Sequence, residues 1–143
     1  MLKNNIIKLI NKKSFIYLDE FLKVVHQDQG LGYYATQNPI GKEGDFITAP
    51  EVSQLYGEII AITIINKIKQ KKIKKFELIE LGPGKGTLMK DIVRIFEKIL
   101  DKKIDNSINF FEINREYRSK LTNEFPNCKI HSKLKALNNN SNY

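Results

Sequence analysis

A carboxylate followed by three closely spaced glycines is the segment of this sequence whose residue types point most directly to chemistry. Glu80 precedes Gly82, Gly84 and Gly86, and the mostly apolar stretch 76–81 leads into them. Glycines allow a sharp turn and let a ligand lie against the backbone. The free N–H groups of a following helix favour a polar or anionic group. A carboxylate here would repel a pyrophosphate, so it favours a ligand with a cationic or hydroxyl-rich part.

The glycine spacing excludes two phosphate-binding motifs. A dinucleotide fingerprint needs its third glycine where Thr87 stands. A P-loop needs Gly-x-x-x-x-Gly-Lys-Ser/Thr, but Lys85 is followed by Gly86 and Ile79 occupies the leading position. An ordinary tight turn between a strand and a helix remains the alternative to a nucleoside site.

Two strands and a crossover helix are expected to position these residues. The residues after Thr87 show helical apolar spacing, and a second strand is predicted over 108–112 with Glu112 at its end. In nucleotide-binding α/β folds such an acidic residue binds two ribose hydroxyls. The gap of 30 residues from Gly82 exceeds the usual ~20, and the helix with the loop 102–107 accounts for the excess. A solvated charge at the strand end is the alternative.

Helical patterns dominate the part of the chain before the glycines. Residues 1–29 predict two short amphipathic helices, with Ser14 as a start signal for the second. Turn-forming residues make 35–46 a loop. Thr48 and Glu51 have the spacing of a capping box, followed by a helix of about five turns up to Ile68.

The remaining elements follow Glu112. Asn114 is predicted to cap a third helix that Pro126 stops, and residues 128–131 are predicted to form a short third strand. The lysine-rich run 67–75 is interpreted as a solvated helix end rather than a nucleic-acid patch.

Composition narrows the class of protein. The 143 residues have room for one domain, and the formal charge of +8 comes from 21 Lys and only 3 Arg. The numbers of Ile (21) and Asn (14) are high together with that of Lys, which indicates coding bias in an A/T-rich genome. We therefore expect no nucleic-acid partner. Cys128 stands alone and there are two isolated histidines, so neither disulfides nor a metal site are expected, and a reducing cytosol fits. No apolar run approaches the ~18 residues of a membrane span.

Three segments in the right order resemble one family: 32–34 (Gly-Tyr-Tyr), 44–58 (beginning Gly-Asp-Phe-Ile-Thr-Ala-Pro-Glu) and 80–88. It is the family of mitochondrial dysfunction protein A (MidA-like). The members of this family are class I S-adenosylmethionine-dependent methyltransferases. The family includes the mitochondrial complex I assembly factor that acts as a protein arginine methyltransferase. The match runs from roughly 18 to 137. It implies an α/β fold, namely the first three parallel strands of a Rossmann-like class I methyltransferase after an α-helical N-terminal extension.

The resemblance also implies site residues, while no catalytic residue is assigned. S-adenosyl-L-methionine would be bound by Glu80, Gly82, Pro83, Gly84, Gly86, Thr87 and Glu112. A lid or substrate-entrance segment would contribute Asp45, Thr48, Pro50, Glu51 and Gln54.

The resemblance divides the chain and suggests partners. Residues 1–75 would form the helical extension with a lid-like loop over 35–51, residues 76–137 a truncated cofactor-binding half-domain, and residues 138–143 a disordered tail. Family members are more than twice as long, so the strand 76–81 would keep one unpaired edge.

This implies the N-terminal piece of a truncated or split gene, inactive when isolated. Its expected partners are a protein substrate, with a respiratory complex I subunit as candidate, and a separately encoded C-terminal half. Alternatives are a non-catalytic interaction or assembly module and the inactive product of a decaying gene. The expected location is the cytoplasm of a bacterium, or the mitochondrial matrix in a eukaryote.

Overall fold

Three parallel strands form one sheet in the computed structural model, which describes residues 1–101, 103–104 and 107–133. They are β1 (Leu78–Leu81), β2 (Ile108–Phe111) and β3 (Lys129–His131), in the spatial order β1-β2-β3. Helix α6 (Thr87–Leu100) connects β1 to β2, and α7 (Arg115–Glu124) connects β2 to β3. All carboxyl ends therefore lie at one edge of the sheet, where Glu80 is near the end of β1 and the glycines and Glu112 follow the strands.

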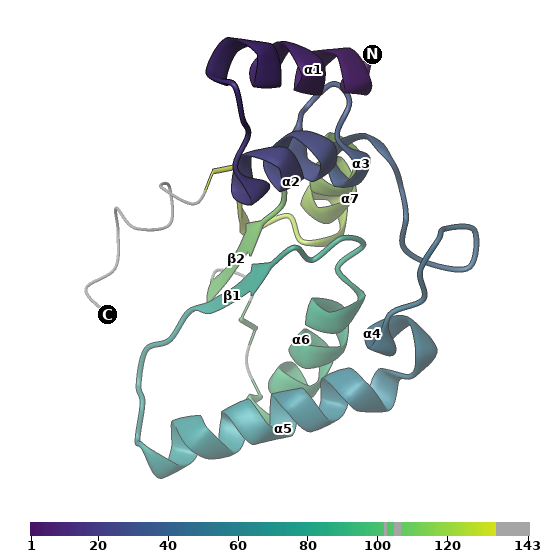
Figure 1. Ribbon diagram of the computed structural model, residues 1–143. Helices are drawn as coiled ribbons and strands as arrows, with labels where there is room; N and C mark the ends of the chain where they lie inside the picture. Colours follow the sequence, from purple (N-terminus) through teal and green to yellow (C-terminus); the bar gives the residue numbers. More distant parts are fainter. Residues whose placement is uncertain (102, 105–106, 134–143) are drawn as a thin grey trace.

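Helices α5 (Gln54–Gln70), α6 and α7 pack with one face of the sheet into a single core (Figure 1). Phe96 of α6, Phe110 of β2 and Leu121 of α7 are fully buried at its centre. The apolar residues of α6 recur at helical spacing, which is why the sequence predicted this helix. The third predicted helix is also confirmed, since Asn114 caps α7 by accepting from the N–H groups of Glu116 and Tyr117.

Helix α5 approaches α6 closely at Gly57. A Cβ atom built on Gly57 would lie 2.5 Å from Cβ of Asp91 on α6. Beside this contact Arg94 donates to Glu58 of α5 at 2.8 Å and to Asp91 at 3.1 Å. Helices α5 and α6 are thus held together by close packing at Gly57 and by the guanidinium of Arg94.

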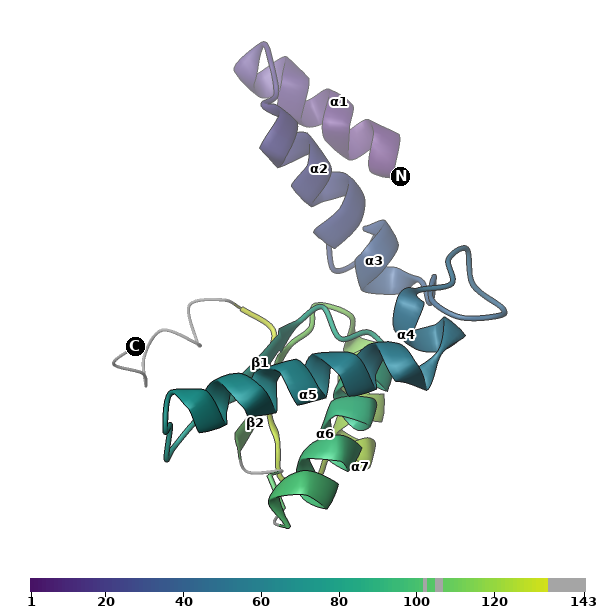
Figure 2. The same cartoon turned by 90° about the horizontal axis from the view of Figure 1, so that it is seen from below.

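Three helices lie beyond the carboxyl edge of the sheet: α1 (Leu2–Lys13), α2 (Leu18–Gln27) and α3 (Tyr33–Thr36). Helices α1 and α2 extend away from the core (Figure 2). The prediction of two amphipathic helices is confirmed. Ser14 does not begin the second one. It ends α1 with a left-handed backbone (φ 66°), and α2 begins four residues later, where the N–H of Tyr17 donates to Glu20.

Thr48 is the N-cap residue of the helix that follows it, as predicted, but the side-chain bonds of the predicted capping box at Thr48 and Glu51 are absent. The side chain of Thr48 makes no capping bond to α4 (Ala49–Val52), and Glu51 bonds to distant residues instead. The expected single helix is also interrupted. Ser53 adopts an extended backbone (φ −154°) and its hydroxyl accepts from the N–H of Leu55 at 3.2 Å, so it caps α5 as a separate helix.

Among the described residues, β1 pairs only with β2 and keeps one open edge, as predicted. Ile79 is 37% exposed and Leu81 63% exposed. An apolar stripe on α5, formed by Leu55, Ile59 and Ile62, is also exposed. The predicted tail 138–143 lies outside the described residues. In the part of the chain that the structure describes, no helix combines the length and the apolar composition needed to cross a membrane.

Candidate functional site

The glycine turn connects β1 to α6 with left-handed backbone at each glycine. The backbone angle φ is 68° at Gly82, 56° at Gly84 and 78° at Gly86. Residues other than glycine adopt this left-handed region at a cost of about 1–2 kcal/mol. The N–H of Gly82 donates to the carbonyl of Phe111 at 2.8 Å, and the N–H of Gly86 donates to the carbonyl of Pro83 at 2.9 Å. These bonds define one tight turn against the end of β2.

The three glycines have different surroundings. A Cβ atom on Gly82 would have nothing within 4 Å, so this position faces open space. A Cβ atom on Gly86 would lie 2.8 Å from Leu121 and 3.1 Å from Phe125, so this glycine is needed for packing against α7. Gly84 is intermediate, because its Cβ atom would lie 2.7 Å from the flexible end of Ile40 and 4.0 Å from the ring of Tyr117.

Glu112 is brought to the turn as the sequence predicted. Its side chain is buried, with Oε2 accepting from the N–H of Gly84 at 3.0 Å and Oε1 accepting from the N–H of Asn114 at 2.7 Å. Burial raises the pKa of this carboxyl, and the backbone N–H groups of Asn114, Gly84 and Ile113, with the charge of Arg118, partly oppose the rise. A carboxylate has about four acceptor positions, so acceptor capacity remains for a hydroxyl of a ligand.

A cavity of about 320 Å³ adjoins the turn and is lined by Gly82, Gly84 and Glu112. Seven further lining residues were not predicted from the sequence: Gln27, Tyr34, Pro39, Ile40, Phe111, Ile113 and Tyr117. The wall formed by Tyr34, Pro39 and Ile40 comes from the N-terminal region. The segment 32–34 did belong to the family resemblance, and it is the signal that could have indicated this wall.

Glu80 lies beside Glu112 rather than in the lining of the cavity. It is opposite Phe110 in the sheet, so both carboxylates are on the same face, offset by two residues. Burial, and then the nearby charge of Glu112, raise the pKa of Glu80 to about 7. Its Oε2 is buried and has no hydrogen-bond partner among the described residues. Two carboxyl groups with raised pKa values thus lie next to the cavity, and a cationic ligand bound there would favour their charged forms.

Of the predicted lid residues, Glu51 reaches the glycine turn. It accepts a hydrogen bond from the hydroxyl of Thr87, and its Oε2 is 3.5 Å from Nζ of Lys85. Lys85 also packs against Gly41 (φ 105°), where a Cβ atom would lie 1.9 Å from Nζ. Thr87 is thus engaged with the lid, while Pro83 is buried in the turn.

A larger cavity of about 840 Å³ adjoins this contact. Glu51 and Lys85 line it from one side, and Glu116 and Lys120 of α7 line it from another. Ile40 lines both this cavity and the smaller one. The loop that carries Ile40 therefore separates the two spaces.

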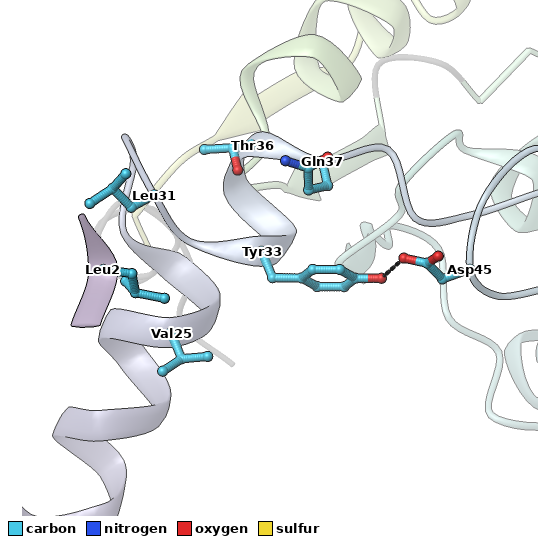
Figure 3. Close-up of a pocket in the computed structure, with 7 residues that line it drawn as sticks. All are labelled: Leu2, Val25, Leu31, Tyr33, Thr36, Gln37 and Asp45. Carbon is cyan, nitrogen blue, oxygen red and sulfur yellow. Dashed lines mark hydrogen bonds between the residues drawn. The ribbon is translucent and has the colours of Figure 1, made fainter. Parts of the chain in front are cut away.

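The other predicted lid residues lie away from the turn. Asp45 accepts from the hydroxyl of Tyr33, which raises the pKa of Tyr33 to about 12 (Figure 3). This pair lines a third cavity of about 430 Å³, with Leu2 and Val25 among its other residues. Thr48 and Gln54 are exposed and Pro50 is half-buried.

A family model described as "putative S-adenosyl-L-methionine-dependent methyltransferase" matches residues 59–137, more than half of the chain. The chain belongs to this family. The matched region contains β1, the glycine turn, α6, β2 and Glu112. The family recognised from the sequence is thereby confirmed, and S-adenosylmethionine is the cofactor of the family.

Several curated relatives are similar in sequence. The protein arginine methyltransferase NDUFAF7, mitochondrial, of Bos taurus is 41% identical over 119 residues, which cover 81% of this chain and 27% of the relative. The Homo sapiens protein of that name is 38% identical, covering 71% of this chain and 24% of the relative. The Danio rerio protein is 30% identical, covering 90% and 30%. The chain spans about a quarter of the length of the curated relatives it matches.

A crystal structure of a Burkholderia thailandensis protein bound to S-adenosyl-homocysteine has a similar fold, with a TM-score of 0.73 and 20% identity. The match covers 93% of this chain and 37% of that chain. The predicted fold class is confirmed: the chain has the N-terminal part of a class I methyltransferase fold after a helical extension.

Proposed function

We propose that this chain forms the S-adenosylmethionine-binding part of a methyltransferase whose whole form methylates a protein, with arginine as the acceptor residue. In this proposal residues 76–133 supply the cofactor half, and residues 1–75 supply the helical extension and the lid. The observation that carries it is the cavity in which Gly82 faces open space beside Glu112, itself bonded to the N–H of Gly84.

The residues present fit that cofactor. The free acceptor positions of Glu112 suit ribose hydroxyls, and the absence of a side chain at Gly82 leaves room for the nucleoside. The buried carboxylate of Glu80 favours the positive charge of the sulfonium and the amino group. When bound, S-adenosylmethionine supplies a methyl group that an acceptor nitrogen can displace in line. The protein residues named here contribute mainly by positioning.

We further propose that the larger cavity next to Ile40 is the entrance for the acceptor, with Glu51 holding the lid against the turn. The relatives named protein arginine methyltransferases support a protein substrate. A subunit of respiratory complex I is our candidate for it. The relatives' names include the word mitochondrial, which supports the matrix as the location in a eukaryote. The cytoplasm is the corresponding proposal for a bacterial chain.

Isothermal titration with S-adenosyl-homocysteine tests the cofactor site. We expect the chain to bind it, and Glu112→Ala to weaken binding at least about tenfold, because a hydrogen bond to a charged group contributes about 1.5–3 kcal/mol. Glu124→Ala is the matched control, since Glu124 is exposed and pairs only with Lys90 among the described residues. Absence of binding by the unmodified chain, or equal binding by Glu112→Ala, would refute the assignment.

The open edge of β1 and the exposed stripe on α5 favour a second role, as an interaction module. We propose that these surfaces bind a polypeptide equivalent to the unmatched part of the relatives, supplied by a separate chain or by the same protein. An unpaired strand edge provides backbone groups for one more strand. Leu55, Ile59 and Ile62 provide the apolar area for a helix.

Co-expression with the unmatched part of the bovine relative tests this second role. We expect the two chains to co-purify, with loss of the complex for Ile59→Glu and retention for the control Asn123→Glu, which changes an exposed polar position on α7, away from the stripe and from β1. Failure to co-purify would remove this proposal. Co-purification by Gly84→Val together with loss of S-adenosyl-homocysteine binding would separate the interaction from the cofactor site.

A further inference from the structure

Asn114 is the residue at which three parts of the cavity wall meet. It is 2% exposed, and it lies two positions after Glu112 at the start of α7. Its side-chain Nδ2 donates to the carbonyl of Tyr34 at 3.1 Å and to the carbonyl of Gln37 at 2.8 Å. The sequence predicted Asn114 only as the cap of a helix.

All hydrogen-bonding positions of this amide are used. Oδ1 accepts from the N–H of Glu116 at 2.9 Å and from the N–H of Tyr117 at 3.2 Å. Reversing the amide would set its NH2 group against two N–H donors and its oxygen against two carbonyls, so one orientation alone satisfies the network. The backbone N–H of the same residue donates to Oε1 of Glu112.

We infer that Asn114 is a positioning residue of the cofactor site: it fixes the segment 34–37 of the wall relative to Glu112 and Tyr117. This inference rests on the proposed function. Tyr34, Glu112 and Tyr117 all line the cavity, and each is connected to Asn114 through its own backbone or side chain. The two bonds made by Nδ2 join residues that are 77 and 80 positions apart in the sequence, so few hydrogen bonds between sequence neighbours can replace them.

Asn114→Asp separates the two tasks of this side chain. An aspartate caps a helix as well as an asparagine does, so α7 should form normally. Its carboxylate has no donor for the carbonyls of Tyr34 and Gln37, and it would repel them. We therefore expect hydrogen exchange in the segment 33–41 to become at least about tenfold faster than in the unmodified chain. We also expect S-adenosyl-homocysteine affinity to fall about tenfold, because the two hydrogen bonds that hold this part of the wall are lost.

Lowering the pH provides a readout that a purely structural defect would not give. Protonation gives the introduced carboxyl one O–H donor, so the exchange difference from the unmodified chain at the same pH should shrink. The charged or titratable groups around this position are Glu112, Glu116, Tyr117 and Arg118, whose Nη1 donates to the carbonyls of Glu112 and Ile113. His26 of α2 also contacts the ring of Tyr34, with 5.3 Å between the ring centroids. Comparison at equal pH removes their contribution.

Two further variants complete the test. Asn114→Ser keeps a capping hydroxyl without introducing charge, so it should loosen 33–41 equally but show no recovery at low pH. Thr122→Ala, which removes a bond to the carbonyl of Arg118 on α7, should leave exchange at 33–41 and affinity unchanged.

Unchanged exchange at 33–41 in both Asn114 variants, or affinity equal to that of the unmodified chain, would overturn the inference. If the unmodified chain does not bind S-adenosyl-homocysteine, the proposed function fails, whereas the exchange experiment still tests the connection.

Discussion

The two sides of the glycine turn use the same residue type for different purposes. On the cavity side Gly82 faces open space and Gly84 donates to Glu112. On the opposite side Gly86 is in contact with Leu121 and Phe125 of α7. A regular spacing in the sequence thus combines a requirement for ligand access with a requirement for helix packing, and substitutions can separate the two.

Gly86→Val should have the largest effect and should act on stability. A branched side chain would adopt a left-handed backbone and would overlap Leu121, so we expect the free energy of unfolding to fall by about 4 kcal/mol. Urea unfolding measures it. Gly82→Ala is the control, with an expected loss of only about 1 kcal/mol from its backbone. Equal losses would contradict the distinction between the two sides.

Glu80→Gln should change how stability depends on pH. Glu80 has a pKa of about 7 in the folded chain and 4.5 as its ordinary value, so between these pH values the folded state binds more protons than the unfolded state. Stability should therefore fall as pH rises from about 4.5 to about 7, by up to about 3 kcal/mol. Urea unfolding at pH 5 and pH 8 should show a smaller difference for Glu80→Gln. An unchanged difference would mean that Glu80 is not the titrating group.

Gly82→Ala should affect binding more than folding. Its methyl group would enter the open space of the cavity, so we expect S-adenosyl-homocysteine affinity to fall about tenfold, or about 1.4 kcal/mol. Isothermal titration provides the value. Binding equal to that of the unmodified chain would show that the ligand does not approach this glycine.

Glu51→Gln should have the smallest effect and should be local. Lys85 is 37% exposed, and such partly exposed ion pairs contribute about 0.2–1 kcal/mol. We expect the global free energy of unfolding to change by less than about 1 kcal/mol, while hydrogen exchange in 41–52 becomes faster. Exchange that stays unchanged there would mean that Glu51 does not hold the lid.

Local patterns in the sequence predicted most of the fold. The apolar stripes of α1, α2, α6 and α7, and the alternation of strand and turn residues, depend on neighbours within a few positions. The predicted capping box was wrong because the carboxylate of Glu51 has a partner 36 residues away, the hydroxyl of Thr87. Sequence spacing could not reveal this competition.

The residues of the candidate site also fall into two groups, those that local sequence patterns predict and those that they do not. Glu112 and the glycines are adjacent to strand ends, so topology alone places them together. How the N-terminal region folds back over the turn determines the positions of Tyr34 and Ile40 in the cavity wall. It also determines the two bonds that the side-chain Nδ2 of Asn114 donates. No periodicity in the sequence encodes that contact.

The edge of β1 that has no partner strand among the described residues has a consequence for handling this chain in solution. Its backbone groups can receive a strand from any neighbouring molecule, and the adjacent Leu81 is largely exposed. Light scattering that rises steeply with protein concentration would be the sign of such self-association. Experiments on ligand affinity should therefore be made on dilute samples, with a companion polypeptide added when higher concentrations are required.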